Sequence, residues 1–93
     1  PGYIFEVMRS YVLAAKSIGF DDETARTLVL DTIAGTVETA RQSADTLEEL
    51  RTSVTSENGT TQVGLAELMR DRKLEVLFQI TVQAAYNRAI RLR

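Results

Sequence analysis

The sequence has no cysteine and no histidine among its 93 residues. These two absences exclude disulfide bonds, Cys/His zinc sites, thiol nucleophiles and imidazole bases. We therefore expect no metal site, and any chemistry must use hydroxyls, carboxylates, cations or backbone amides. The core is also expected to be small, because a domain of this length buries only about 60 to 65% of its unfolded surface.

Charge and hydropathy limit the partners. The formal net charge is −2, with acidic and basic residues interspersed, so the chain has no basic patch for nucleic acid or for an anionic membrane surface. No apolar run approaches the roughly 20 residues that a membrane-spanning helix needs, and the opening residues do not form a signal peptide. We expect a cytoplasmic protein with neither nucleic acid nor membrane as a partner.

Breaks in the hydrophobic pattern divide the chain into five segments. The breaks lie at residues 19–22, 43–46, 53–59 and 71–73, where glycine and small or charged polar residues gather. No segment shows sustained alternation with a period of two, so strands are not expected. The sequence predicts an all-α domain of five helices, at about residues 3–18, 22–42, 46–53, 62–69 and 73–91.

The two long helices, at about 22–42 and 73–91, have more apolar surface than a small intrachain bundle can cover. Apolar residues occupy most of the circumference of the first of them, and such a helix is normally buried on nearly all sides. A second copy of the chain would complete the core and form a homodimer. Burial against another domain of the same chain is the alternative.

Local signals mark the second and third helices. Asp21 is the expected N-cap of the second helix, and Thr46 with Glu49 forms a capping box at the start of the third. Gly35, in the middle of the second helix, lowers helix stability by roughly 1 kcal/mol relative to alanine. We interpret it as the place of a close helix crossing, with a tolerated surface glycine as the alternative.

The segment before the fourth helix carries the candidate site. Asn58 and Gly59 can both adopt left-handed backbone angles, which allows a sharp turn. Such a turn would expose the N–H groups of Gly59, Thr60 and Thr61 as a seat for a carboxylate or phosphate. Ordinary helix capping explains the same residues. Asn58-Gly59-Thr60 also matches the glycosylation pattern, although no secretory signal accompanies it.

Residues 50–65 resemble a family signature. They read L-R-T-S-V-T-S-E-N-G-T-T-Q-V-G-L, and the signature of the pyrroline-5-carboxylate reductases is V-x-S-P-G-G-T-T-x-x-G-L. Three further features agree with that family, and the resemblance covers essentially the whole chain. Pro1-Gly2-Tyr3 resembles the G-P-A-Y opening of its dimerisation domain, Gly19 and Ala25-Arg26 fit its G-x-x-x-x-x-A-R spacing, and Val82-Gln83-Ala84-Ala85 resembles its final helix.

The resemblance implies a domain organisation. The family reduces 1-pyrroline-5-carboxylate to L-proline with hydride from NAD(P)H, using an N-terminal Rossmann domain and a C-terminal helical domain that interlaces with a partner subunit. Residues 1–93 would be a single C-terminal dimerisation and substrate-binding domain that begins at a domain boundary. The Rossmann domain is absent, because no G-x-G-x-x-G fingerprint or strand pattern occurs. We expect these residues alone to bind no cofactor and to lack reductase activity.

The resemblance also assigns roles in the loop. It implies that Ser56 and the amides of Gly59, Thr60 and Thr61 bind the substrate carboxylate. The Thr61 hydroxyl would face the imine nitrogen, which makes Thr61 the candidate catalytic residue. A hydroxyl is a modest hydrogen-bond donor, so we expect Thr61 to orient the ring more than to act as a strong acid.

Two loop residues depart from the family signature. Glu57 stands where the family usually has proline, and Asn58 stands where it usually has glycine. Asparagine tolerates positive φ, whereas Glu57 places a negative charge beside the expected carboxylate seat. A dimerisation module of a related dehydrogenase, a paralogue without this activity, and an unrelated helical interaction protein therefore remain alternatives.

Overall fold

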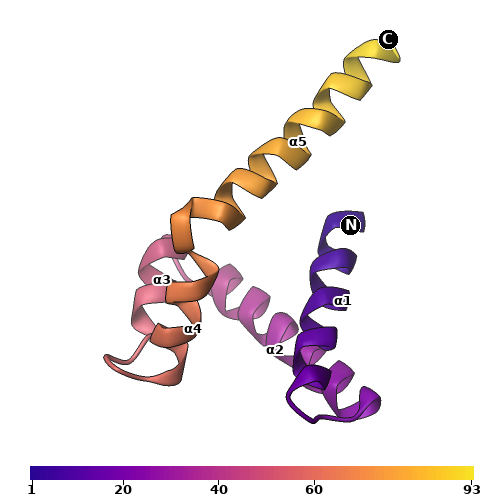
Figure 1. Cartoon of the computed structure of the whole chain (residues 1–93). Coiled ribbons are helices and arrows are strands. Elements are labelled where there is room, and N and C mark those ends of the chain that lie inside the picture. The colour runs from indigo at the N-terminus through magenta and orange to yellow at the C-terminus, as the bar shows by residue number, and fades with distance from the viewer. The chain divides into compact units, whose positions relative to one another are not determined.

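The computed structural model describes the whole chain, residues 1–93, and every regular element in it is a helix (Figure 1). The all-α prediction is therefore confirmed. The elements are α1 Gly2–Ser17, α2 Asp22–Gln42, α3 Leu47–Ser53, α4 Thr60–Leu68, the 3₁₀ helix η1 Arg70–Arg72 and α5 Lys73–Arg91. They belong to two compact units, the first from Pro1 to Leu47 and the second from Glu48 to Arg93.

In the first unit α1 packs against α2 after a short turn. Gly19 makes this turn at φ +114, an angle that side chains rarely adopt, and its N–H donates to the Lys16 carbonyl at 3.0 Å. Ala25 and Val29 are buried and lie four residues apart, so they share one face of α2. These two small side chains are the whole apolar interior of the unit.

Asp21 caps α2, as the sequence predicted. Its carboxylate accepts a hydrogen bond from the Thr24 backbone N–H at 2.7 Å, and Asp22 and Glu23 follow in the first turn, where the helix dipole favours negative charge. The bond from Thr24 lowers the pKa of Asp21 below its ordinary value. The cap is therefore strongest when Asp21 is ionised.

In the second unit two left-handed residues separate α4 from α5. Asp71 and Arg72 have φ values of +55 and +57, which interrupt the helical path and redirect the chain. Ion pairs flank the interruption, one between Arg70 and Glu67 and the other between Arg72 and Glu75. Both pairs are well exposed, and exposed pairs contribute little to stability. The redirection of the chain thus depends on the backbone angles more than on the charges.

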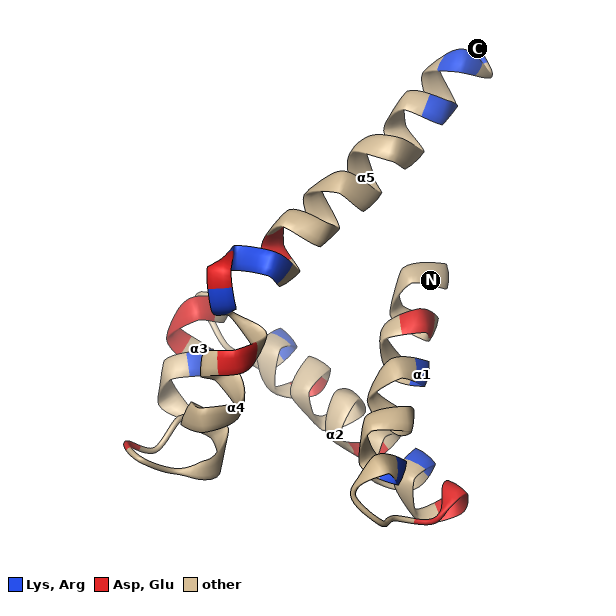
Figure 2. Ribbon diagram, in the orientation of Figure 1, with Lys and Arg blue, Asp and Glu red and all other residues tan.

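α5 has an uncharged stretch between Glu75 and Arg88, which Figure 2 shows as an unbroken tan ribbon. None of its side chains is buried. Its exposed large apolar side chains are Leu74, Val76, Leu77, Ile80, Val82, Tyr86 and Ile90. Even so, neither this helix nor any other is both long and apolar enough to cross a membrane.

Both units leave most of their large apolar side chains exposed. Apart from Ala25 and Val29, no apolar side chain is buried. The apolar surplus expected from the sequence is therefore present on the structure.

Gly35 has no close neighbour within the first unit. A Cβ added at Gly35 would meet nothing within 4 Å, so the close helix crossing predicted from the sequence is not made by α1. The buried face of α2, with Ala25 and Val29, lies toward the start of the helix, and Gly35 lies beyond it. The alternative interpretation, a tolerated surface glycine, describes the single chain.

We expect the Asp21→Asn variant to lose less stability in acid than the unaltered chain. Because the pKa of Asp21 is lowered by folding, its contribution is present above the ordinary carboxyl pKa and is lost as the pH falls through the lowered value. Asparagine caps a helix at every pH. Thermal unfolding would be measured at about pH 6 and about pH 2, on either side of the carboxyl range. Between these two pH values, Tm should decrease less in Asp21→Asn than in the unaltered chain.

The control is Asp31→Asn, because Asp31 lies within α2 and does not cap it. This variant should respond to acid as the unaltered chain does. An equal decrease of Tm in Asp21→Asn and in the unaltered chain would contradict a charge-dependent cap.

Candidate functional site

The loop between α3 and α4 makes a sharp turn, but only one of its two candidate residues is left-handed. Asn58 has φ +60, as the sequence allowed. Gly59 has φ −84 and ψ 173 and is the N-cap of α4, so a left-handed Gly59 is wrong. The reason is that an N-cap residue takes extended angles as the chain enters a helix, and Asn58 alone completes the reversal.

Gly59 is required for space rather than for its angles. A Cβ at Gly59 would lie 3.2 Å from both the Cβ and the carbonyl oxygen of Ser56, and 3.6 Å from the Ser56 hydroxyl oxygen. The Gly59 N–H donates to the Ser56 carbonyl at 3.0 Å and closes the turn. Ser56 therefore lies directly against the backbone at the start of α4.

The first turn of α4 presents three backbone N–H groups that have no acceptor in the chain, those of Thr60, Thr61 and Gln62, because the first bond to the N-cap carbonyl comes from Val63. The prediction of a free N–H on Gly59 is wrong because that group donates to Ser56. Free N–H groups at a helix N-terminus favour an anion, and the helix dipole adds to this preference. Of the three backbone donors expected for the carboxylate seat, those of Thr60 and Thr61 are free.

The candidate residues lie together on open surface. Ser56, Thr60 and Thr61 are exposed, Gly59 is half-buried, and no side chain caps α4. Glu57 is also exposed beside them. The hydroxyls therefore do not cap buried amides. The grooves lined by α1 and α2 and by residues of α5 include no residue of this loop.

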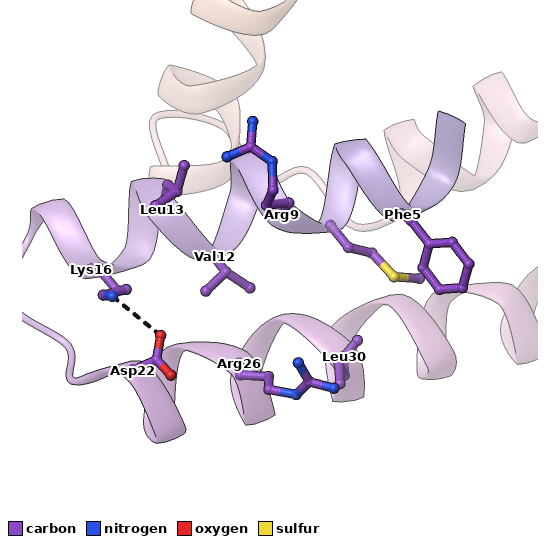
Figure 3. Close-up of a pocket in the computed structure, with 9 residues that line it drawn as sticks. Phe5, Arg9, Val12, Leu13, Lys16, Asp22, Arg26 and Leu30 are labelled. Atoms are coloured by element: carbon purple, nitrogen blue, oxygen red, sulfur yellow. Dashed lines mark hydrogen bonds and ion pairs between the residues drawn. The ribbon is translucent and has the colours of Figure 1, made fainter. Parts of the chain in front are cut away.

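A separate groove of about 340 Å³ lies between α1 and α2 (Figure 3). Phe5, Val12 and Leu30 are among the apolar side chains that line it. The ion pair between Lys16 and Asp22, at 3.2 Å, closes one end. Sequence reasoning did not single out this groove, because its residues come from two helices and show no motif.

The charged side chains beside the groove are exposed, and two ion pairs lie among them. Arg9 donates twice to the Glu6 carboxylate, each time at 2.8 Å, which lowers the pKa of Glu6 and raises the pKa of Arg9. Arg26 also lines the groove and has no ion-pair partner. No group of three or more acidic side chains lies close enough together to hold a metal ion.

Comparison with known proteins decides the family. The family model described as "Pyrroline-5-carboxylate reductase dimerisation" matches residues 1–92. The chain belongs to this family. The resemblance of the loop to the family signature predicted the same family, and that prediction is confirmed.

Curated relatives carry the same reductase name. Pyrroline-5-carboxylate reductase 2 of Bacillus subtilis is 35% identical over 85 residues, which are 91% of this chain and 31% of that protein. The reductases of Staphylococcus haemolyticus and Staphylococcus saprophyticus are 30% and 32% identical over 92 residues, 99% of this chain and 34% of each protein. The chain therefore spans about a third of the length of these relatives. No solved structure matches it.

We expect Gly59→Ala to destabilise this family member and Gly64→Ala to leave it unchanged or more stable. An alanine Cβ at Gly59 would press on Ser56, whereas one at Gly64 would meet nothing within 4 Å. Alanine is also the better helix former, by about 0.8 to 1 kcal/mol. Urea unfolding of both variants at one protein concentration should give a lower midpoint for Gly59→Ala than for Gly64→Ala. A midpoint for Gly59→Ala at or above that of Gly64→Ala would contradict the spatial role of Gly59.

Proposed function

We propose that residues 1–93 are the dimerisation and substrate-binding part of a pyrroline-5-carboxylate reductase, which reduces 1-pyrroline-5-carboxylate to L-proline with NAD(P)H. The observation that carries this proposal is the family match over residues 1–92. The names of the curated relatives support it. So does the loop, whose Ser-x-x-Gly-Thr-Thr residues stand at the start of α4 with two free backbone donors.

Nucleotide binding is assigned to the remainder of the reductase. A dinucleotide site of the Rossmann type needs a strand, a glycine-rich turn and a helix, and residues 1–93 contain no strand. We therefore assign a Rossmann-type nucleotide site to residues of the reductase outside 1–93. Their part in the reaction is to bind and orient the imino acid.

Homodimer formation is the second part of the proposal, and it is supported by the surface of the chain. Large apolar side chains stand exposed on the helices of both units. Burying them between two copies would give the apolar, extensive interface that is typical of obligate dimers, above about 2,000 Å² in total. The uncharged stretch of α5 and the exposed Leu28, Leu30 and Val37 of α2 supply apolar surface for it.

We expect a dimer at micromolar concentration, with an interface dominated by α2 and α5. Analytical ultracentrifugation of the chain measures this directly. Replacing Ile80, which is 62% exposed, by lysine would place a charge in the uncharged stretch of α5 and should shift the population toward monomer. As a control, Glu57→Lys changes an exposed loop residue and should leave the dimer intact. A compact, stable monomer of the unaltered chain would contradict the proposal.

The loop would bind substrate through its free donors. A carboxylate at the start of α4 can accept hydrogen bonds from the Thr60 and Thr61 N–H groups and from the Ser56 hydroxyl. With the carboxylate fixed there, the Thr61 hydroxyl can donate to the ring nitrogen, which orients the imine and makes its carbon more electrophilic. Thr61 is exposed, so its hydroxyl is free to take this role.

We expect Thr61→Ala to lower the turnover of the full-length reductase by about 10- to 1,000-fold, the scale of one lost transition-state donor. Dimerisation should hardly change. The matched control is Thr52→Ala, because the Thr52 hydroxyl donates to the Glu48 carbonyl within α3 at 3.1 Å and faces no substrate. Turnover and sedimentation would be measured on the same preparations. Unaltered turnover in Thr61→Ala would remove Thr61 from the site.

A related dehydrogenase or a paralogue with another substrate is the second candidate. The observation that favours it is Glu57, an exposed carboxylate beside the proposed seat. A negative charge there disfavours an anionic substrate. Absence of activity toward 1-pyrroline-5-carboxylate in the unaltered full-length protein, with the dimer preserved, would select this candidate.

A further inference from the structure

One side-chain hydrogen bond at the start of α4 joins two residues that the family signature does not prescribe. The Asn58 backbone N–H donates to the side-chain oxygen Oε1 of Gln62 at 2.5 Å. Gln62 occupies a position that the signature V-x-S-P-G-G-T-T-x-x-G-L leaves open, and Asn58 stands where the signature has glycine. The bond therefore joins a variable residue to a residue that departs from the pattern.

The position of Gln62 explains why the bond forms. Gly59 is the N-cap of α4, so Gln62 is the third helical residue, from which a glutamine can reach back to the N-cap N–H in a capping box. Here the Gly59 N–H already donates to the Ser56 carbonyl. The Gln62 side chain therefore accepts a hydrogen bond from the preceding N–H group, that of Asn58.

Asn58 needs this support because of its backbone angles. A left-handed conformation is unfavourable for a residue with a side chain, although asparagine tolerates it better than most. Glycine in the same place would have no such strain. Hydrogen bonding to Gln62 fixes the Asn58 peptide, and through it the direction in which Gly59 enters α4 and in which the Thr60 and Thr61 N–H groups point.

We propose that Gln62 is a positioning residue of the substrate seat, which acts by holding Asn58 in its left-handed conformation and does not touch the substrate. The inference rests on the proposed reductase function. It identifies the Asn58–Gln62 pair as this chain's substitute for the first of the two adjacent glycines of the signature.

The test uses the full-length reductase with Gln62→Met, which removes the acceptor while keeping side-chain length and helix propensity. Loss of one hydrogen bond should raise KM for 1-pyrroline-5-carboxylate by about 2- to 12-fold, with kcat and KM for the nucleotide changed far less. Adding Asn58→Gly to Gln62→Met should restore KM, because glycine adopts the left-handed angles unaided. Gln42→Met is the control, since Gln42 donates to Glu38 at 2.7 Å within α2 and makes no hydrogen bond to the loop.

The outcomes separate this inference from the proposed function. An unchanged KM in Gln62→Met, or a raised KM that Asn58→Gly does not restore, would overturn the positioning role and leave the reductase proposal intact. Absence of reductase activity in the unaltered full-length protein would overturn the proposed function and the inference together. A raised KM restored by glycine, with normal sedimentation of every variant, supports the role, because a merely structural helix cap would not be restored by a change at Asn58.

Discussion

Shortage of buried apolar surface is the constraint on which this structure depends. Only Ala25 and Val29 are buried, and two such side chains contribute little against the conformational entropy that folding removes. Helices in proteins owe most of their stability to the packing of an apolar face. The caps and surface ion pairs of this chain set where helices begin and end, but they cannot replace that packing. The proposed homodimer is the arrangement that would supply it.

Loop geometry has a different origin. Here the conformation follows from contacts between near neighbours in sequence: Gly59 with the Ser56 carbonyl, and Asn58 with Gln62. These contacts need no distant element, so the donors at the start of α4 are oriented within one protomer. The walls of a closed site would have to come from outside the loop, because the loop residues stand on open surface. Orientation and enclosure of the substrate are thus separate tasks in this chain.

Sequence reasoning succeeded where a pattern has one physical outcome. An aspartate before an apolar helix has little other role than to cap it, and Asp21 does so. The helical period likewise had one interpretation, and every regular element is a helix. Sequence reasoning failed where residues permit several outcomes. Asn58 and Gly59 can both be left-handed, and the place of the N-cap, which Gly59 takes in extended conformation, decides between them.

Longer-range features lay beyond the sequence. Gly35 indicated a close crossing, but which face of α2 meets α1 depends on the turn at Gly19 and on the Ala25 and Val29 face. Gln62 gave no signal, because its role arises only after the Gly59 N–H is occupied. The roles proposed for Ser56 and Thr61 came from the family signature and could not have come from hydroxyl residues before a helix alone.

The uncharged stretch of α5 has a consequence for protein quality control in the cell. A protomer without a partner would display a long helix face free of charge, and such surface is what chaperones and proteases recognise on unassembled subunits. Association follows the square of the protomer concentration, whereas clearance by a protease follows the first power. Steady-state abundance would therefore rise more steeply than the rate of synthesis, so weak expression would yield disproportionately little assembled protein.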